Sequence, residues 1–207
     1  MKIQSFQTIV SAEKSSYKEN SSEFITKIFP IKTLDGFQAK LQAIKKEYHN
    51  ATHHCYAFHL VNGGEKYSDD GEPAGTAGIR ILNAIHHYEL KDVAIIVVRY
   101  FGGTKLGVGP LGIAYSQAAM LAISKCKIIC KRPFLPLSVT IPFEQTSKIY
   151  HLFSLHHVKL KETLFSENAT YHILLLFEEK DSFLQKLNDL FNGKIEVTIS
   201  DRIEYFE

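Results

Sequence analysis

Residues 92–101, DVAIIVVRYF, constrain the fold of this chain more than any other stretch. The run is almost uniformly apolar from Val93 to Val98, and most of its side chains are β-branched. A strand with one face in water alternates apolar and polar residues, whereas a strand covered on both faces shows a continuous apolar run. The sequence therefore predicts a central strand whose two faces are both covered by other parts of the chain.

Periodicity on either side of this run predicts further helices and strands in the first two thirds of the chain. In the helix expected over 33–50, Phe37, Leu41 and Ile44 recur on one face. Thr33 is its expected N-cap, because a threonine hydroxyl can accept from the free amides of the first turn. A polar loop is expected over 11–21. The other predicted elements are strands 2–10, 22–31 and 54–61 and helices 77–90 and 110–125.

Two prolines in KRPFLP, residues 131–136, interrupt the pattern and mark a domain boundary. Beyond them the order of predicted elements is βαββαβ, which is that of a ferredoxin-like domain. These elements are strand 137–143, helix 144–157, strands 158–166 and 169–179, helix 181–192 with Asp181 as its cap, and strand 193–206. The chain is therefore interpreted as an α+β protein with an N-terminal domain, residues 1–132, and a C-terminal domain, residues 133–207.

Composition argues against a membrane protein and against a disulfide-stabilised one. No apolar run approaches the ~20 residues that span a bilayer, and the first residues lack the apolar core of a secretory signal. The chain has three cysteines, Cys55, Cys126 and Cys130, and no CxxC. This usage fits a reducing compartment. A cytoplasmic protein with no membrane partner is expected.

Charge divides unevenly along the chain. Residues 1–132 hold 17 Lys and Arg against 11 Asp and Glu, a net of +6, and residues 133–207 hold 7 against 11, a net of −4. A basic half beside an acidic half indicates an anionic partner for the first. An ordinary solvated charge excess explains the same numbers equally well.

Familiar catalytic and metal-binding motifs are absent from the sequence. GGTKLG lacks the Gly-Lys-Ser/Thr of a Walker loop, Ser116 lies outside a nucleophile elbow, and no H-E-x-x-H occurs. The ligand types at 53–55 (HHC) alternate in direction along a strand, so they do not converge. The histidine pairs at 86–87 and 156–157 are interpreted as helix-end residues rather than ligands. No zinc site is expected.

Two glycine-rich loops, residues 68–78 (SDDGEPAGTAG) and 101–109 (FGGTKLGVG), each precede a predicted helix. Glycines let a ligand approach the main chain, and free amides at a helix start attract anions. Arg99 comes just before the second loop and Lys105 lies within it, so a phosphate-bearing ligand between the loops is reasonable. The candidate anion-binding or nucleic-acid-binding residues are Arg99, Lys105, Tyr100, Gly102, Gly103, Gly75 and Thr76.

Three carboxylates in the first loop, Asp69, Asp70 and Glu72, leave its role open. They would repel bare phosphate unless magnesium bridges the two, or unless they pair with Arg99 or Lys105. Helix starts also favour Asp and Glu as caps, and Asp70 or Glu72 is then expected to cap the helix at 77. A metal site, an anion site and a structural cap all remain compatible with these residues.

Four stretches closely resemble the signature of the IMPACT family, in its bacterial YigZ-type two-domain branch. They are HHCYAF, SDDGEPAGTAG, VVRYFGG and KLGVGPLGIAY, and the resemblance runs from about residue 18 to the end of the chain. It implies an N-terminal α/β domain of the ribosomal-protein and elongation-factor type. A ferredoxin-like domain similar to the last domain of elongation factor G should follow. Ile113 stands where relatives typically carry a basic residue.

The resemblance implies a regulator of translation that binds RNA, the ribosome or a translation factor, with no established catalytic activity; no cofactor is expected for such a regulator. Binding of RNA through Lys and Arg is expected to weaken as salt rises. The alternative from the residues is a magnesium-dependent enzyme acting on a nucleotide or phosphorylated ligand, with Asp69, Asp70 and Glu72 holding the metal. A third possibility is a protein–protein adaptor that uses the acidic C-terminal domain.

Overall fold

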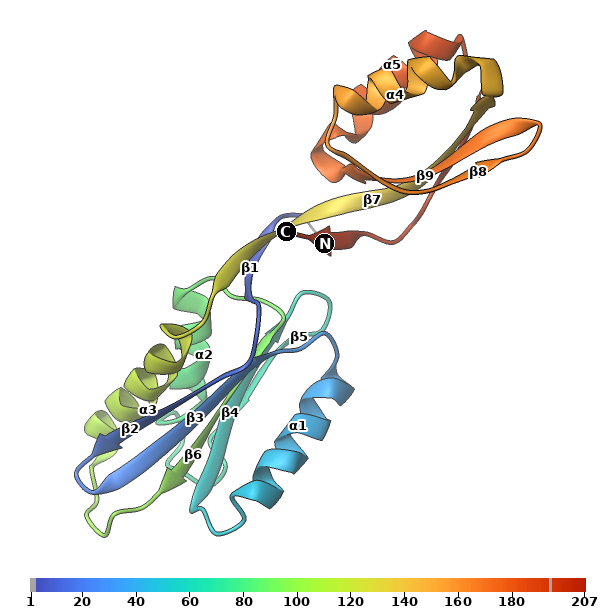
Figure 1. The fold of residues 1–207 in the computed structure, drawn as a ribbon. Helices are drawn as coiled ribbons and strands as arrows, with labels where there is room; N and C mark the ends of the chain where they lie inside the picture. The colour runs from blue at the N-terminus through green and yellow to red at the C-terminus, as the bar shows by residue number, and fades with distance from the viewer. Residues whose placement is uncertain (1–2, 194) are drawn as a thin grey trace. The chain divides into compact units, whose positions relative to one another are not determined.

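The computed structural model describes residues 3–193 and 195–207, and it divides into two compact units. Phe6–Cys130 forms the N-terminal domain, and the described residues from Lys131 onward, with those before Phe6, form the C-terminal domain. Figure 1 shows both. Lys2 and Lys194, which fall in two predicted strands, lie outside the described residues. No helix in the described part of the chain is long and apolar enough to cross a membrane.

The N-terminal domain is built on a five-stranded antiparallel sheet with β6 in the middle. The side chains from Val93 to Val98 are fully buried in β6, which confirms the predicted central strand. In sheet order the strands are β2 (Glu13–Glu19), β3 (Ser22–Pro30), β6 (Val93–Tyr100), β4 (His53–Leu60) and β5 (Gly64–Ser68). The short strand β1 (Phe6–Ile9) precedes them in the chain.

Helices cover both faces of this sheet, which is why β6 carries no polar side chain before Arg99. Helix α1 (Leu34–Glu47) packs on the face of Ala94, Ile96 and Val98. Helices α2 (Gly78–His87) and α3 (Val108–Ile123) pack on the opposite face (Figure 1). The Thr33 hydroxyl accepts from the Gly36 amide at 3.1 Å, so the predicted N-cap of α1 is confirmed.

The edges of the sheet differ from the prediction. The polar loop expected over 11–21 contains strand β2, and the strand β5 that follows the turn after β4 was not predicted. Ser15 is the one fully buried residue of β2, and none of β5 is fully buried. An edge strand is held by main-chain pairing on one side and needs little apolar surface, so hydrophobic periodicity does not reveal it.

The C-terminal domain has the predicted ferredoxin-like arrangement. Its sheet runs β8-β9-β7-β10 with antiparallel neighbours, and β11 pairs with β7 further along the strand. Both helices bury apolar side chains against the same sheet core. The elements are β7 (Ile128–Pro142), η1 (Phe143–Gln145), α4 (Thr146–Ser154), β8 (Val158–Phe165), β9 (Asn168–Leu176), η2 (Phe177–Glu179), α5 (Lys180–Phe191), β10 (Glu196–Ile199) and β11 (Glu204–Phe206).

Three details of the prediction for this half are wrong. The prolines of 131–136 do not interrupt the strand, because β7 continues through them. Pro133 precedes the pairing with β9, and Pro136 lies between the segments paired with β11 and β10, so neither needs a full ladder of amides. The predicted last strand is divided into β10 and β11. Asp181 lies in the first turn of α5, whose N-cap residue is Glu179.

Candidate functional site

The carboxylate loop, residues 68–78, is organised around Asp69. One oxygen of its carboxylate accepts from the amides of Ala77 and Gly78 at 3.0 and 2.7 Å, and the other accepts from the amide of Gly75 at 2.9 Å. The Ala77 and Gly78 amides lie at the start of α2, where an outside anion would otherwise bind, and the Gly75 amide lies in the loop before it. Asp69 therefore caps α2, in place of the expected Asp70 or Glu72.

Asp70 ties this loop to neighbouring elements. Its carboxylate accepts from the His54 amide at 2.7 Å and from Lys45 Nζ of α1 at 3.1 Å. His53 Nδ1 lies 2.8 Å from the Asp70 carbonyl oxygen and donates to it. Asp70 adopts a left-handed backbone with φ of 42°, which aspartate tolerates better than most residues. The side chain thus fixes the loop against β4 and α1.

Glu72 forms a buried ion pair with Arg99. Their side chains are only 3% and 6% exposed, and Arg99 Nη1 donates to Glu72 Oε1 at 2.7 Å. The Tyr115 hydroxyl of α3 donates to the same oxygen at 2.7 Å. A buried charge pair of this kind is tolerated because each partner has hydrogen bonds inside the protein. Glu72, Arg99 and Tyr115 together join the loop, β6 and α3.

Cys55 lies beside this pair but is not an activated nucleophile. Its thiol donates to the Asp69 carbonyl oxygen at 2.9 Å and also lies 3.3 Å from the Tyr115 hydroxyl. Burial raises the pKa of the Cys55 thiol, and burial likewise raises the pKa of Tyr115. Since nucleophilic attack requires the thiolate, the protonated Cys55 is inert here. The side chains around Glu72 and Arg99 are buried and held by hydrogen bonds inside the domain, so they stabilise its fold.

The remaining candidate residues fall into two groups. Thr76 is buried and donates from its hydroxyl to Pro73, whereas the Tyr100 hydroxyl donates to Asn50 at 2.9 Å. Gly102 packs against the β2–β3 turn so closely that a Cβ would lie 2.1 Å from the carbonyl carbon of Ser21. Gly103 and Lys105, in contrast, are exposed to solvent. The structure therefore places Thr76 in the interior and Gly103 and Lys105 at the surface.

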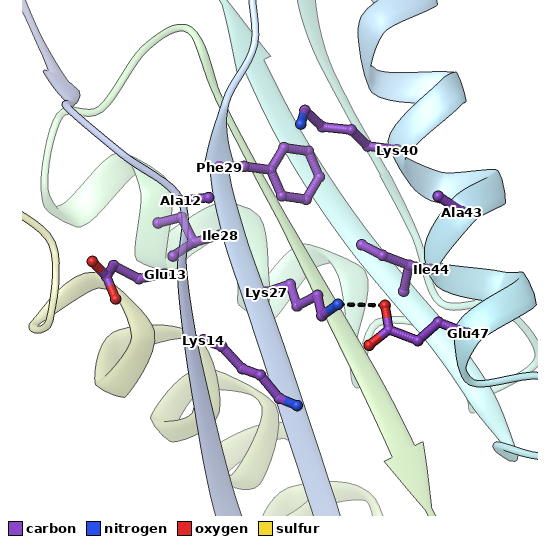
Figure 2. Close-up of a pocket in the computed structure, with 10 residues that line it drawn as sticks. All are labelled: Ala12, Glu13, Lys14, Lys27, Ile28, Phe29, Lys40, Ala43, Ile44 and Glu47. Carbon is purple, nitrogen blue, oxygen red and sulfur yellow. Dashed lines mark hydrogen bonds and ion pairs between the residues drawn. The ribbon is translucent and has the colours of Figure 1, made fainter.

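A groove that the sequence prediction missed opens between α1 and the β2–β3 edge of the sheet. We call it the lysine groove, and its volume is about 550 Å³. Lys14 and Lys27 line it from β2 and β3, and Lys40 lines it from α1 (Figure 2). The full lining is Ala12, Glu13, Lys14, Lys27, Ile28, Phe29, Lys40, Ala43, Ile44 and Glu47.

Positive charge is concentrated in this groove by the register of the sheet. Lys14 and Lys27 are directly opposite each other, and both ammonium groups lie over the Tyr48 ring, at 5.6 and 5.1 Å from its centroid. Lys27 also donates to Glu47 at 2.6 Å, and this hydrogen bond lowers the pKa of the Glu47 carboxyl. Lys14 and Lys40 are exposed, so they can reach a ligand in the groove.

The fold and the carboxylate loop define a class of protein, an Impact-type N-terminal domain followed by a small ferredoxin-like domain. The Impact N-terminal domain family matches residues 20–123, and the domain of unknown function DUF1949 matches residues 139–194. The chain belongs to the IMPACT family, which confirms the resemblance found in its motifs.

Several relatives and one solved structure are similar over most of the chain. IMPACT family member YvyE of Bacillus subtilis (strain 168) is 30% identical over 94% of this chain and 91% of its own length. IMPACT family member YigZ of Escherichia coli (strain K12) is 28% identical over 85% of this chain and 88% of its own length. A crystal structure of a hypothetical protein, 24% identical, covers 96% of this chain and 99% of its own, with a TM-score of 0.65. That likeness shows the shared fold.

Proposed function

We propose that this chain is a non-catalytic, translation-linked protein that binds RNA through the lysine groove of its N-terminal domain. The resemblance of its motifs to a family of translation regulators supports the translation link. The observation that carries the RNA-binding surface is the convergence of Lys14, Lys27 and Lys40 on one groove. Neutralising phosphates with lysines is the main source of affinity in sequence-independent RNA binding.

The cross-strand pair of Lys14 and Lys27 supports an anionic ligand more than an empty groove. Like charges directly opposite on neighbouring strands are destabilising. Glu47 offsets part of this repulsion, because it accepts from Lys27 at 2.6 Å, and Tyr48 and then Glu47 raise the pKa of Lys14. A phosphate between the two strands and α1 would relieve this repulsion. Lys40, on the opposite wall, extends the positive surface across the groove. The backbone of an RNA strand supplies phosphates at repeated intervals, which suits a groove better than a point site.

The geometry lends no support to the magnesium-dependent alternative. In the described residues, the three carboxylates of the loop are held by different donors: Asp69 by helix amides, Asp70 by His54 and Lys45, and Glu72 by Arg99 and Tyr115. A magnesium site needs oxygens that converge on one octahedral ion. The proposed function accordingly uses no cofactor.

We propose the cytoplasm as the compartment, in keeping with the cysteine usage. Cys55, Cys126 and Cys130 are free thiols. Burial raises the pKa of Cys126 to about 11, so this thiol is protonated near neutral pH. Free thiols suit a reducing compartment that also contains ribosomes and RNA.

The test is fluorescence anisotropy of a labelled single-stranded RNA with the full chain at several potassium chloride concentrations. The double variant Lys14→Ala/Lys40→Ala should weaken binding and lower the slope of log affinity against log salt by roughly 0.7 per lysine. The matched control is Lys148→Ala/Lys186→Ala, which removes two exposed lysines from the C-terminal domain. Equal losses in both double variants would overturn the groove as the binding surface. Wild-type affinity that is independent of salt would overturn RNA binding through phosphates.

A further inference from the structure

Three side chains with metal-binding atoms meet at the far edge of the N-terminal sheet. His59 of β4 and Glu65 of β5 are directly opposite in register, and His86 comes from the last turn of α2. Helix α2 packs against both of these strands. Each of the three residues offers one ligand atom, and these atoms all lie within 4.8 Å of one another. The group is thus positioned by two paired strands and a helix, not by loops.

The ring of His59 is held in the orientation that a ligand requires. Its Nδ1 lies 3.1 Å from the Leu90 carbonyl oxygen and donates to it, which leaves Nε2 with a free lone pair. Histidines that bind metals nearly always donate their other ring nitrogen to a carbonyl or carboxylate in this way. The backbone carbonyl that follows α2 therefore selects the tautomer of His59 that can bind a cation.

Glu65 and His86 are the two exposed members of the group. His86 Nε2 lies 2.6 Å from Glu65 Oε2, and each side chain is 44% exposed. The rings of His59 and His86 meet edge to face, with centroids 5.7 Å apart. Ligand atoms around a tetrahedral zinc ion lie roughly 3.3 Å apart, given bonds of about 2.0 Å. The Glu65–His86 pair, now 2.6 Å apart, must open to this spacing, and both side chains are exposed enough to rotate.

We infer that His59, Glu65 and His86 form a binding site for one divalent transition metal ion, with Zn²⁺ as the best-matched ion. Two imidazoles and one carboxylate are ligand types that zinc accepts, whereas magnesium prefers an all-oxygen set. Three protein ligands leave a fourth position open to water. The site involves none of the carboxylates of the loop and none of the lysines of the groove, so it is independent of the proposed RNA binding.

The test uses the untagged full chain, because an affinity tag rich in histidine would bind the same ions. Zn²⁺ affinity is measured by competition with a chromophoric chelator, and Co²⁺ is added separately to record its visible absorption bands. Glu65→Gln and His86→Gln replace exposed side chains, and circular dichroism checks that both variants keep the fold. His87→Gln is the matched control, since His87 is an exposed neighbour on the same helix outside the group.

The expected result is one Zn²⁺ per chain, with affinity reduced at least ~10-fold in Glu65→Gln and in His86→Gln and unchanged in His87→Gln. Co²⁺ should give tetrahedral absorption bands in the wild type that each ligand variant loses. Absence of saturable Zn²⁺ binding would overturn the site. Equal binding by the wild type and both ligand variants, or equal losses in His87→Gln, would also overturn it.

Discussion

The carboxylate loop and the lysine groove use charge in opposite ways within one domain. In the loop, the charges are matched: Asp69 is held by helix amides and Glu72 by Arg99. In the groove, Lys14 and Lys27 are brought together by strand pairing, Glu47 pairs with Lys27, and Lys40 adds a third positive charge. Matched charges in the interior stabilise one conformation, whereas gathered like charges at a surface favour a ligand of opposite sign.

The residues that identify the family and the residues proposed to bind the ligand therefore lie in different parts of the domain. In SDDGEPAGTAG, the stretch that identifies the chain, Asp69, Asp70 and Glu72 each accept hydrogen bonds from groups inside the N-terminal domain, so the fold explains these three residue types. The lysines of the groove carry no motif, and the pairing of β2 with β3 places Lys14 opposite Lys27. A family motif can therefore owe its residue types to the fold, whereas residues outside any motif can form a candidate binding surface.

The largest expected effect is the loss of stability when the buried Glu72–Arg99 ion pair is broken. Arg99→Met leaves Glu72 charged in the interior without its guanidinium partner, which should lower the opening free energy of the N-terminal domain by about 3–5 kcal/mol. Hydrogen exchange of the β6 amides, followed by mass spectrometry, measures this domain separately. The double variant Arg99→Met/Glu72→Gln should recover part of the loss, because it removes both charges.

RNA binding by the Arg99→Met variant tests whether the buried pair also contributes to the binding surface. Under conditions where the variant is folded, its affinity and salt dependence should match the wild type, since Arg99 is buried and faces Glu72. A selective loss of RNA affinity with unchanged hydrogen exchange would return Arg99 to the binding surface. It would also refute the division of the domain into scaffold and groove.

An intermediate effect is expected at the helix cap. Asp69→Ala removes the acceptor of two amides at the start of α2 and of the Gly75 amide in the loop before it, and loss of a cap costs about 0.5–2 kcal/mol. Hydrogen exchange of the first-turn amides of α2 should rise in this variant. Asp69→Asn keeps one acceptor oxygen and should lose less. Protection that is unchanged in Asp69→Ala would show that the carboxylate does not hold this loop.

The main architecture could be predicted because it depends on burial. The apolar run Val93–Val98, the helical face of Phe37, Leu41 and Ile44, and the order of elements after β7 all follow from how much of each side chain must leave water. The edge strands β2 and β5 could not be predicted in this way. Their place is determined by main-chain pairing with a neighbour, which leaves little trace in side-chain pattern.

The sites were harder to predict, because each depends on contacts between distant parts of the chain. The carboxylates of the loop were identified, but only the structure shows that Asp69 reaches the amides at the start of α2. The lysine groove was missed because pairing Lys14 with Lys27 requires β2, which was expected to be a loop. His86 was interpreted as a helix-end residue, since its approach to Glu65 depends on how α2 packs on an unpredicted strand.

The smallest expected effect is the interaction energy between Lys14 and Lys27 in the groove. A double-mutant cycle with Lys14→Gln, Lys27→Gln and the combined variant isolates the energy between the two lysines from their other contacts. Without RNA, this energy should be repulsive, at about 0.2–1 kcal/mol, because the pair is directly opposite across two strands. Thermal or urea unfolding at low salt measures it.

Raising the salt concentration should weaken this coupling, since both side chains are accessible to counterions. Adding a saturating RNA should reverse its sign, because a phosphate shared by two lysines links them favourably. A coupling that stays repulsive with RNA bound would mean that the two lysines do not share a ligand. The carboxylate loop and the lysine groove would then differ only in burial, because the two lysines would share no ligand.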